Sequence, residues 1–212
     1  MKITHLGHAA VLVETAGARI LIDPGSFSDQ WHGLTELDAV VITHQHPDHV
    51  DAEHVPGLLE ANPSARVYCE PSVPQAVDLA GATALPSGER ATVGAVEIAA
   101  VGGEHAIIHR DIPMIGNVGV LIRAEGEPTL FHPGDSLAVC PEGVDLLALP
   151  VMGPWAALKE HIDFVRAVGA PRAFPIHDGL LNERGWGLYT SRTADMSDTE
   201  VLDWRDGQAH EV

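Results

Sequence analysis

The sequence predicts an α/β fold formed by a single domain over residues 1–212. Short apolar runs with several β-branched residues, such as residues 39–42, are typical of buried strands. Apolar residues at helical spacing follow, first over residues 50–61, and strands and helices then alternate. A chain of 212 residues buries about 70% of its extended surface on folding, which is enough for one sizeable core.

The first half of the chain is predicted to begin with a β-hairpin and to continue as strands and helices. A turn at Gly7-His8 joins the first two strands, and Asp23-Pro24 ends the third. The expected elements are, in order, strands 3–6, 10–14 and 19–23, an irregular stretch 26–37, strand 39–42, helix 50–61, strand 66–69, helix 71–81, and strands 83–85, 91–93 and 96–101. This order fits one α/β half of a layered domain.

The second half is predicted to add a hairpin, two further strands and two helices. The expected elements are strands 117–123, 129–131 and 144–150, helix 156–168, strand 172–176, a covering loop 179–189 and helix 193–204. His161 shares its helix with Lys159 and Glu160, so we expect its side chain to face solvent. His210 is expected to lie at the chain end without a structural role.

Residues 43–49, with the sequence Thr-His-Gln-His-Pro-Asp-His, place three imidazoles and a carboxylate directly after a buried strand. Because neighbours alternate on an extended chain, His44 and His46 point to the same side. Asp48 can return to that side as the chain turns, with His49 beside it. A pair of imidazoles suits zinc, iron or manganese, and an adjacent carboxylate and imidazole suit a second ion. A polar turn is the alternative, but this spacing favours a metal site.

The stretch His44-Gln45-His46-Pro47-Asp48-His49 matches the H-x-H-x-D-H signature of the metallo-β-lactamase superfamily, which the chain resembles. Further residues of that pattern recur in order along the chain, namely Asp23 after residues 19–22, His105 after residues 102–104, Asp135 within residues 131–136, and His177 within residues 175–178. The resemblance covers most of the chain, and it implies a four-layered αββα metallo-β-lactamase sandwich.

The resemblance also implies two bound divalent metal ions. The ligands would be His44, His46 and His105 for the first ion, Asp48, His49 and His177 for the second, and Asp135 as a bridge between them. Asp23 would orient a ligand through hydrogen bonds. We expect zinc, with manganese or iron as the alternatives.

Such a metal pair would supply a bridging hydroxide at neutral pH, because a divalent ion lowers the pKa of bound water from about 15.7 to about 7. Asp48 is the predicted catalytic residue, and either Asp48 or a metal-bound water would protonate the leaving group. The sequence therefore predicts a metal-dependent hydrolase that cleaves a small-molecule ester, lactone or phosphoester.

Within the superfamily the chain is most similar to the ascorbate-6-phosphate-lactonase-like group. The similarity rests on Gly7-His8-Ala9, Asp23-Pro24, Gly134-Asp135-Ser136 and Pro175-Ile176-His177. It favours a lactonase or a related esterase without naming a substrate. Asp135 stands where true β-lactamases often carry Cys, which weakens the case for β-lactam hydrolysis.

Other functions on the same scaffold are a mononuclear iron dioxygenase and a phosphodiesterase or nuclease. A non-enzymatic metal-binding or regulatory protein is a further alternative, although the full ligand set argues against it. With 12 Lys plus Arg and 30 Asp plus Glu, the net charge is −18, which disfavours nucleic acid and anionic membranes as partners. We expect a small-molecule substrate as the partner, and the chain could form a homo-oligomer.

The two cysteines, Cys69 and Cys140, form no C-x-x-C pair, and no apolar leader precedes the first strand. We therefore expect no disulfide framework and a cytoplasmic location. No apolar stretch reaches the roughly 18 residues of a membrane span.

Several residues are left open by the sequence. His109 competes with His105 as a metal ligand, and we prefer His105 because it stands at a strand end. His8 either approaches the metals from the first turn or lies on the surface, and Arg110 either binds an anionic group or forms a solvated salt bridge. The candidate residues for the rim of a binding site are Trp31, Trp155 and Trp186.

Overall fold

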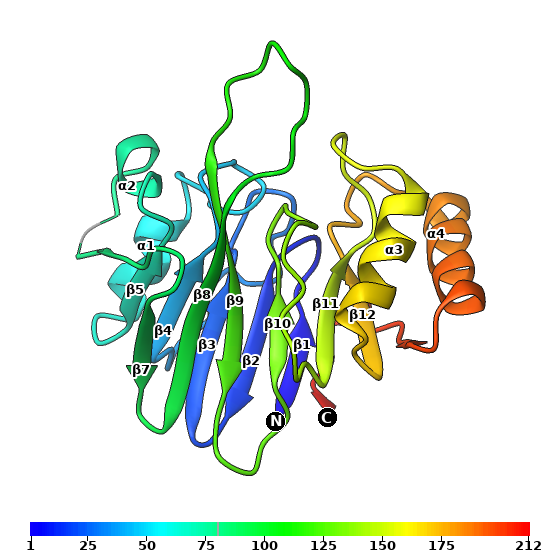
Figure 1. Cartoon of the computed structure of the whole chain (residues 1–212). Helices are drawn as coiled ribbons and strands as arrows, with labels where there is room; N and C mark the ends of the chain where they lie inside the picture. Colours follow the sequence, from blue (N-terminus) through cyan, green and yellow to red (C-terminus); the bar gives the residue numbers. More distant parts are fainter. Residues whose placement is uncertain (80) are drawn as a thin grey trace.

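Two β-sheets packed face to face form the centre of the molecule (Figure 1). The computed structural model describes residues 1–79 and 81–212, and within them each sheet has seven strands. The first sheet contains, in spatial order, β14 (His210–Glu211), β1 (Lys2–His5), β2 (Val11–Thr15), β3 (Ala18–Ile22), β4 (Ala39–Ile42), β5 (Arg66–Cys69) and β6 (Thr83–Ala84). The second contains β13 (Glu200–Val201), β12 (Arg172–Ile176), β11 (Leu146–Pro150), β10 (Leu130–His132), β9 (Gly116–Arg123), β8 (Val96–Glu104) and β7 (Arg90–Val93).

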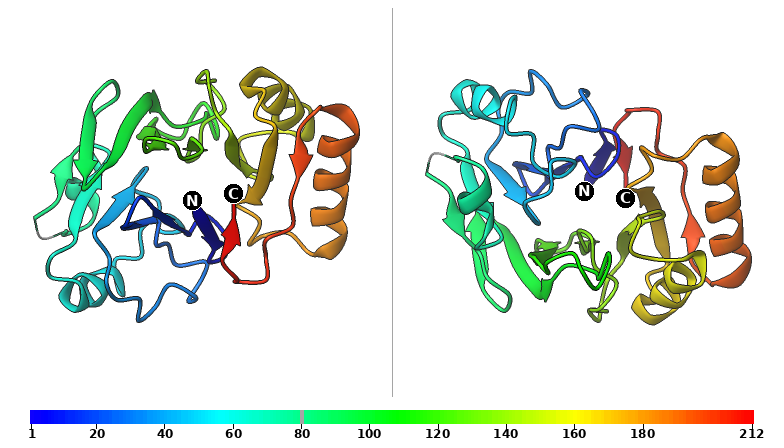
Figure 2. Two further views of the ribbon diagram at one scale, coloured as in Figure 1. Left: turned by 90° about the horizontal axis from the view of Figure 1, so that it is seen from below. Right: turned by 90° about the horizontal axis from the view of Figure 1, so that it is seen from above.

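Helices cover the outer faces of both sheets, as the end-on views of Figure 2 show. The helices are α1 (Val55–Ala61), α2 (Val73–Ala76), α3 (Leu158–Val168) and α4 (Glu183–Met196). α1 and α2 pack on the first sheet, α3 packs on the second, and α4 lies against α3 and β13. The arrangement is the predicted four-layered αββα sandwich.

Three hydrophobic clusters correspond to the three interfaces between these layers. The central cluster lies between the sheets and includes Val41, Val120 and Phe174. The other two lie between each sheet and its helices. Strand β4 contributes to two of these clusters because its alternate residues point to opposite faces of the sheet. Val41 joins the central cluster, and Val40 joins the outer one. A strand buried on both faces must be apolar throughout, as the run of residues 39–42 is.

Strand direction determines where the loops of interest meet. β1 and β3 both pair antiparallel with β2, and β4 pairs parallel with β3, so these three strands run the same way. In the second sheet β8 and β10 both pair antiparallel with β9, and β12 runs parallel to β10 through β11. The carboxyl ends of these six strands lie at one edge of the sandwich, the position at which α/β sheets commonly bind ligands.

Local sequence signals determine where the two long helices begin and end. The backbone N–H of Ala157 donates to Glu160 Oε2 at 2.6 Å at the start of α3, and Gly169 ends that helix in the left-handed conformation, at φ +64°. The side chain of Asn182 accepts hydrogen bonds from the N–H groups of Arg184 and Gly185 at the start of α4. No helix among the described residues is long and apolar enough to cross a membrane.

Several sequence predictions of secondary structure were wrong. The expected helices 50–61 and 71–81 shorten to α1 and α2, each with a Pro in its first turn, and Ala80 of the second range lies outside the described residues. The expected loop 179–189 and helix 193–204 are replaced by α4 followed by the short strand β13. Two glycines within α4 lower its helix propensity, whereas packing against α3 favours it.

Two histidines in the second half also lie elsewhere than predicted. His161 is 1% exposed rather than solvated, because Trp155 and Tyr189 pack against its ring and α4 covers this face of α3. His210 belongs to β14, which pairs with β1, and its ring stacks on Trp204. Both errors arise because the sequence does not show where the C-terminal segment packs on the rest of the molecule.

Candidate metal centre

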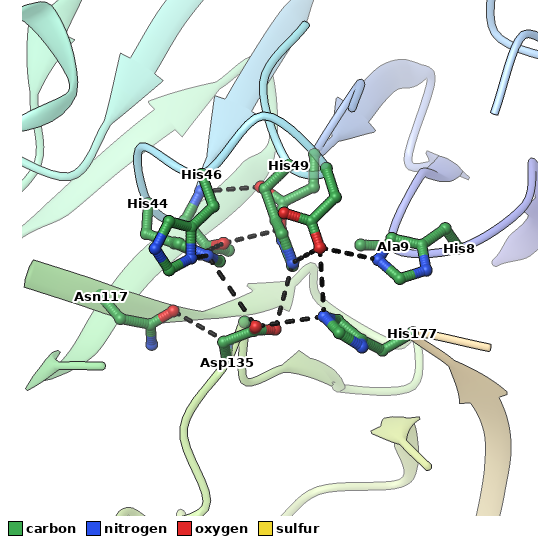
Figure 3. Close-up of polar contacts among 12 residues, drawn as sticks. His8, Ala9, His44, His46, His49, Asn117, Asp135 and His177 are labelled. Carbon is green, nitrogen blue, oxygen red and sulfur yellow. Dashed lines mark hydrogen bonds and ion pairs between the residues drawn. The ribbon is translucent and has the colours of Figure 1, made fainter. Parts of the chain in front are cut away.

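The seven predicted metal ligands lie together at the edge of the sandwich where the carboxyl ends of the strands meet. We call this set the candidate metal centre (His44, His46, Asp48, His49, His105, Asp135 and His177). The segment after β4 supplies four of its members, and the segments after β8, β10 and β12 supply one each. Figure 3 shows the side chains that it labels from both sheets pointing toward one another across this edge.

The turn after β4 is held by the buried carboxylate of Asp23, which follows β3. Thr43 donates to it twice, from its backbone N–H at 2.8 Å and from its hydroxyl at 2.6 Å. His49 Nδ1–H donates to the same carboxylate at 2.7 Å. Asp23 is fully buried, so these donors replace the water that an ionised carboxylate requires. The structure therefore places Asp23 where it orients a predicted ligand.

One group of side chains contains the ligands predicted for the first ion. The potential ligand atoms of His44, His46, His105 and Asp135 lie within 4.8 Å of one another. His44 Nε2 lies 3.1 Å from His46 Nδ1 and 4.0 Å from Asp135 Oδ2, and His105 Nε2 lies 3.4 Å from the same carboxylate oxygen. Atoms at these separations can share one cation.

A second group contains the ligands predicted for the other ion, together with His8. The potential ligand atoms of His8, Asp48, His49 and His177 lie within 4.8 Å of one another. Asp135 reaches this group as well, with Oδ1 3.1 Å from His49 Nε2 and Oδ2 3.1 Å from His177 Nε2. Asp135 therefore stands between the two groups, as a bridging carboxylate would.

Hydrogen bonds orient most of the imidazoles in the same way. The Nδ1–H groups of His105 and His177 donate to the carbonyls of Ala106 and Met152, and that of His49 donates to Asp23. These bonds hold the proton on Nδ1 and leave each Nε2 directed at the centre as an acceptor. His44 follows the same pattern through the Thr43 hydroxyl, at 3.1 Å.

The atoms that face the centre include several buried atoms without a hydrogen-bond partner among the described residues. They are His49 Nε2, His105 Nε2, His177 Nε2 and Asp135 Oδ1. Leaving such atoms buried and unpaired is unfavourable, and a cation would satisfy the lone pairs of all of them. The residues present therefore fit a site for divalent metal.

The electrostatics of the centre also favour a cation. Although burial opposes ionisation, interactions with His49, His105 and His177 hold the pKa of Asp135 well below its usual range. Burial likewise opposes ionisation of Asp48, yet its interactions with the nearby His177 and His8 rings hold its pKa below the usual range. Both carboxylates are thus ionised, and two negative charges, that of Asp135 buried and that of Asp48 half-buried, lie among the imidazoles.

The pKa values of the imidazoles differ according to their partners. Burial and the neighbouring His49 lower the pKa of His44 well below its usual value. For His177 burial acts in the same direction, but Asp135 and Asp48 outweigh it and raise the pKa to about 9. Without a bound cation, His177 therefore carries a second proton, on Nε2, at neutral pH, and a cation beside the carboxylates would take the place of that proton.

His8, which the sequence left open, is 2% exposed and belongs to the site. Gly179 N–H donates to its Nδ1 at 3.1 Å, so the ring proton lies on Nε2, which donates to Asp48 Oδ2 at 3.0 Å. His8 thus holds the Asp48 carboxylate rather than presenting a free ligand atom. Its position in a turn at the carboxyl end of β1 is the sequence signal for this role.

Asn117 is a further residue that sequence reasoning missed. Its side chain, 1% exposed on β9, accepts from Asp135 N–H at 2.9 Å and donates to the Pro133 carbonyl at 2.9 Å. Figure 3 shows this contact to the left of Asp135. Asn117 therefore holds the turn that presents the carboxylate, and no motif within its own strand indicates this.

Four of the remaining candidates lie away from the centre. His109 and Arg110 are exposed in the loop between β8 and β9, and both lie beside Asp111, His109 at 3.6 Å and Arg110 at 3.8 Å. Trp31 is buried and donates to the Gly25 carbonyl, so it does not form a rim. Trp186 packs under the Arg205 guanidinium.

Trp155 is the one tryptophan of those considered that reaches the centre. Its indole N–H donates to Asp135 Oδ2 at 2.9 Å, and its ring lies 6.2 Å from that of His105 between centroids. Trp155 also lines a cavity of about 580 Å³ that adjoins the centre through His105. A bound molecule in this cavity would lie beside the predicted ligands.

A third group of possible ligands lies apart from this site. His32 and His54 are exposed and stack on each other next to Asp51. Asp51 accepts hydrogen bonds from the N–H groups of Glu53 and His54 and from the His54 ring, just before α1. These hydrogen bonds are those of a turn that leads into α1, and they explain why the side chains of Asp51 and His54 lie together.

Known proteins resemble this chain in both sequence and fold. A family model described as the beta-lactamase superfamily domain matches residues 2–177. Protein Rv0786c of Mycobacterium tuberculosis is 41% identical over 202 residues, which cover 94% of each chain. A UPF0173 metal-dependent hydrolase of Xanthobacter autotrophicus is 30% identical over 151 residues, which cover 64% of this chain and 62% of the relative. The crystal structure of the metallo-beta-lactamase fold protein YhfI from Bacillus subtilis matches with a TM-score of 0.77 at 17% identity, covering 100% of this chain and 99% of YhfI.

Proposed function

The chain belongs to the beta-lactamase superfamily and is a metal-dependent hydrolase, and from that premise we propose that it hydrolyses an ester, lactone or phosphoester bond in a small molecule with two bound zinc ions. The observation that carries the proposal is the convergence of the unpaired Nε2 atoms of His49, His105 and His177 on the Asp135 carboxylate. Imidazole and carboxylate donors in this number suit zinc, with manganese and iron as alternatives.

The metal ions, when bound, would polarise the scissile bond and lower the pKa of a bound water to about 7. The chain's own residues orient the centre. Asp23 and Thr43 hold the turn after β4, and Asn117 holds the turn that carries Asp135. Because these contacts are made before any substrate binds, little reorganisation is needed at the moment of reaction.

Asp48 is the proposed acid–base residue. Its Oδ2 lies 3.0 Å from His8 Nε2 and 3.4 Å from His177 Nε2, and its side chain is 19% exposed, whereas that of Asp135 is 4% exposed. Asp48 can therefore be reached by a substrate. With its pKa held low, it is ionised before substrate binds, so it first accepts a proton and then returns it to the leaving group.

Lactones and other esters are the preferred substrates within this proposal. The motifs shared with the ascorbate-6-phosphate-lactonase-like group support a lactonase, and the net charge of −18 supports a small molecule rather than nucleic acid as the substrate. The cavity of about 580 Å³ beside His105 is within the usual size range for small-molecule ligands.

The test combines metal analysis with a substrate panel. Purified protein should contain about two metal ions per chain, and its hydrolysis of a panel of lactones, esters and phosphoesters should disappear on chelation and return with zinc. Oxygen consumption is followed in parallel. Metal-dependent oxygen uptake without hydrolysis of any panel member would favour an iron dioxygenase and contradict the proposal.

Replacing Asp48 with Ala gives the matching variant test. We expect kcat/KM to fall by at least about 100-fold, the usual effect of losing an acid–base group, with an unchanged circular dichroism spectrum. Asp111→Ala, which removes an exposed carboxylate from the loop between β8 and β9, is the control and should retain full activity. Near-normal hydrolysis by the Asp48 variant would exclude the role assigned to this residue.

A further inference from the structure

The cavity beside the candidate metal centre has a composition that restricts the substrate. It lies between the β8–β9 loop, which extends from the edge of the sandwich in Figure 1, and the start of α3. His105 belongs to both the cavity lining and the centre, and Trp155, which also lines the cavity, donates to Asp135 of the centre. A molecule whose scissile bond lies at the metals would therefore place a neighbouring group in this cavity.

Most of the cavity wall is apolar. Its larger apolar members are Ile107, Met114, Leu137, Trp155 and Phe164. Ile107 is 67% and Met114 48% exposed, so these side chains present apolar surface to water beside the site. Burial of that surface by an apolar ligand is favourable.

The charged side chains that line the cavity all carry the same sign. They are the carboxylates of Glu104, Glu160 and Asp163, and no Lys or Arg is among the lining residues. Within the described part of the chain, none of the three forms an ion pair. Their fields add across the cavity mouth, and they disfavour a negative charge there.

The helix N-terminus at the cavity also does not favour an anion. The first turn of a helix ordinarily binds negative charge well. In α3, however, the Glu160 carboxylate already accepts the N–H of Ala157 and supplies that charge. Proteins usually hold a phosphate or carboxylate with a cationic side chain or with a free helix N-terminus. The lining of this cavity contains neither of them.

We propose that this cavity binds an uncharged apolar group of the substrate, tolerates a positive charge at its rim and excludes a negative one. The inference rests on the proposed hydrolase function and narrows it from esters, lactones and phosphoesters in general to esters and lactones with an uncharged or cationic apolar substituent. Substrates with a phosphate or carboxylate on that substituent are disfavoured.

The direct test measures binding to metal-free protein, so that no anion can bind to a metal ion. Tryptophol, tryptamine and indoleacetate carry one ring system with an uncharged, a cationic and an anionic substituent. Titration calorimetry should show indoleacetate binding about tenfold more weakly than tryptophol, as expected for a unit charge near several carboxylates. Tryptamine should bind at least as tightly as tryptophol.

Charge reversal at the rim shows whether this cavity causes the preference. Asp163→Lys changes an exposed position of α3, and it should remove most of the difference between indoleacetate and tryptophol. Glu60→Lys makes the same change in net charge on α1, in the opposite helical layer, and should leave the difference intact. Glu104→Gln is a second, milder variant that should reduce it in part.

Two outcomes of the binding experiment would overturn the inference. One is equal binding of indoleacetate and tryptophol to the unchanged protein. The other is an equal effect of Glu60→Lys and Asp163→Lys, which would mean that net charge, not the cavity, sets the preference.

A kinetic comparison keeps this inference separate from the proposed function. Phenyl butyrate and the monophenyl ester of glutaric acid share the scissile bond, and only the second carries a distal carboxylate. Metal-dependent hydrolysis of both at equal kcat/KM would overturn the inference and leave the hydrolase function standing. If the three ligands bind in the expected order but no ester or lactone is hydrolysed in a metal-dependent way, the proposed function is overturned and the binding preference stands.

Discussion

At the scale of single residues, the centre depends on which nitrogen of each imidazole is free. The Nδ1–H groups of His49, His105 and His177 donate to fixed acceptors, so each ring has little freedom to turn. Fixed rings lose less conformational entropy when a metal binds. The acceptors thus contribute to metal affinity together with the ligands themselves.

His105 and His109 allow a direct comparison within one loop. Replacing His105 with Ala should lower the metal content of the purified protein and weaken zinc binding by at least about tenfold, because a buried Nε2 directed at Asp135 is lost. His109→Ala should leave both unchanged, since His109 is exposed and lies beside Asp111. Mass spectrometry measures the metal content of both variants. If His109→Ala lost metal and His105→Ala did not, His109 rather than His105 would be the ligand.

His161 is a titratable side chain whose burial affects stability. Its ring is 1% exposed, and neither nitrogen has a hydrogen-bond partner among the described residues. Burial lowers its pKa from 6.5 to about 4. The folded state therefore holds the neutral ring, whereas the unfolded chain binds a proton between these two pH values. Stability from this residue is present above about pH 6.5 and is lost as the pH falls toward about 4.

The pH dependence predicted for His161 can be measured by urea denaturation in the presence of a chelator. The free energy of unfolding should fall between about pH 6.5 and about pH 4.5, with His161 contributing up to about 3 kcal/mol of the change. His161→Leu should remove this contribution, and His109→Leu, which removes an exposed imidazole, should not. Identical pH profiles for the unchanged protein and His161→Leu would show that this side chain is not the cause.

Single residues were predictable from the sequence where they lie in a specific motif. Residues 44–49 carry their own spacing signal, and the structure brings His105, Asp135 and His177 to them. Asn117 was missed, His8 was left open and Trp155 was only a candidate rim residue, because each acts through a partner far away in the sequence. Their roles depend on tertiary contacts, and only the position of His8 in a turn after β1 gives a local signal.

At the scale of elements, the site is built from turns at strand ends that bring the backbone into uncommon conformations. His8, Asp23 and His177 have positive φ angles of 51°, 49° and 59°. Each lies at or just beyond the carboxyl end of a strand. Such residues cost of order 1–3 kcal/mol each and persist where the surrounding structure fixes them, as at ligand-binding sites.

Gly25 shows how closely two of these turns approach each other. The Ser26 N–H donates to the Pro47 carbonyl at 2.8 Å, and the Asp51 N–H donates to the Pro24 carbonyl at 2.9 Å. A Cβ atom at Gly25 would overlap the carbonyl group of Asp48. Only glycine lets the turn after β3 lie against the turn after β4 in this way.

Gly25→Ala should therefore disturb the candidate metal centre from outside it. We expect a loss of about 1–3 kcal/mol in the free energy of unfolding, as for an overpacked site, together with a lower metal content. Gly57→Ala in α1 is the matched control, because a Cβ there meets nothing within 4 Å and Ala favours helix by about 1 kcal/mol. Urea denaturation and metal analysis of both variants test this, and equal metal content would argue against close contact between the turns.

Elements were predictable from the sequence where burial alone determines them. The run of residues 39–42 is apolar throughout and forms β4 as expected. The C-terminal segment was assigned wrongly, because α4 contains two glycines and few apolar residues. Its helix is favoured by an Asn182 cap and by contact with α3, and only the first of these is visible in the sequence.

At the scale of the whole molecule, the candidate metal centre connects the two sheets. His44, His46, Asp48 and His49 follow a strand of the first sheet, whereas His105, Asp135 and His177 follow strands of the second. The ionised carboxylates of Asp48 and Asp135 are brought close together in a chain whose net charge is already −18. Cations bound between the sheets would offset that repulsion and connect the two halves.

Metal removal should accordingly lower the stability of the whole fold. A ligand that binds only the folded state at about a thousand times its Kd adds about 4 kcal/mol, and about 2–4 °C per kcal/mol is usual for a chain of this size. We expect chelation to lower Tm by about 10 °C and added zinc to restore it. Calorimetry with and without chelator gives the difference.

Asp135→Ala, which removes the carboxylate shared by both groups, should abolish the response to zinc, whereas His109→Ala should retain it. An unchanged Tm after complete metal removal would mean that the sheets hold their positions at this edge without the ions, and that packing of the central core alone sets the stability.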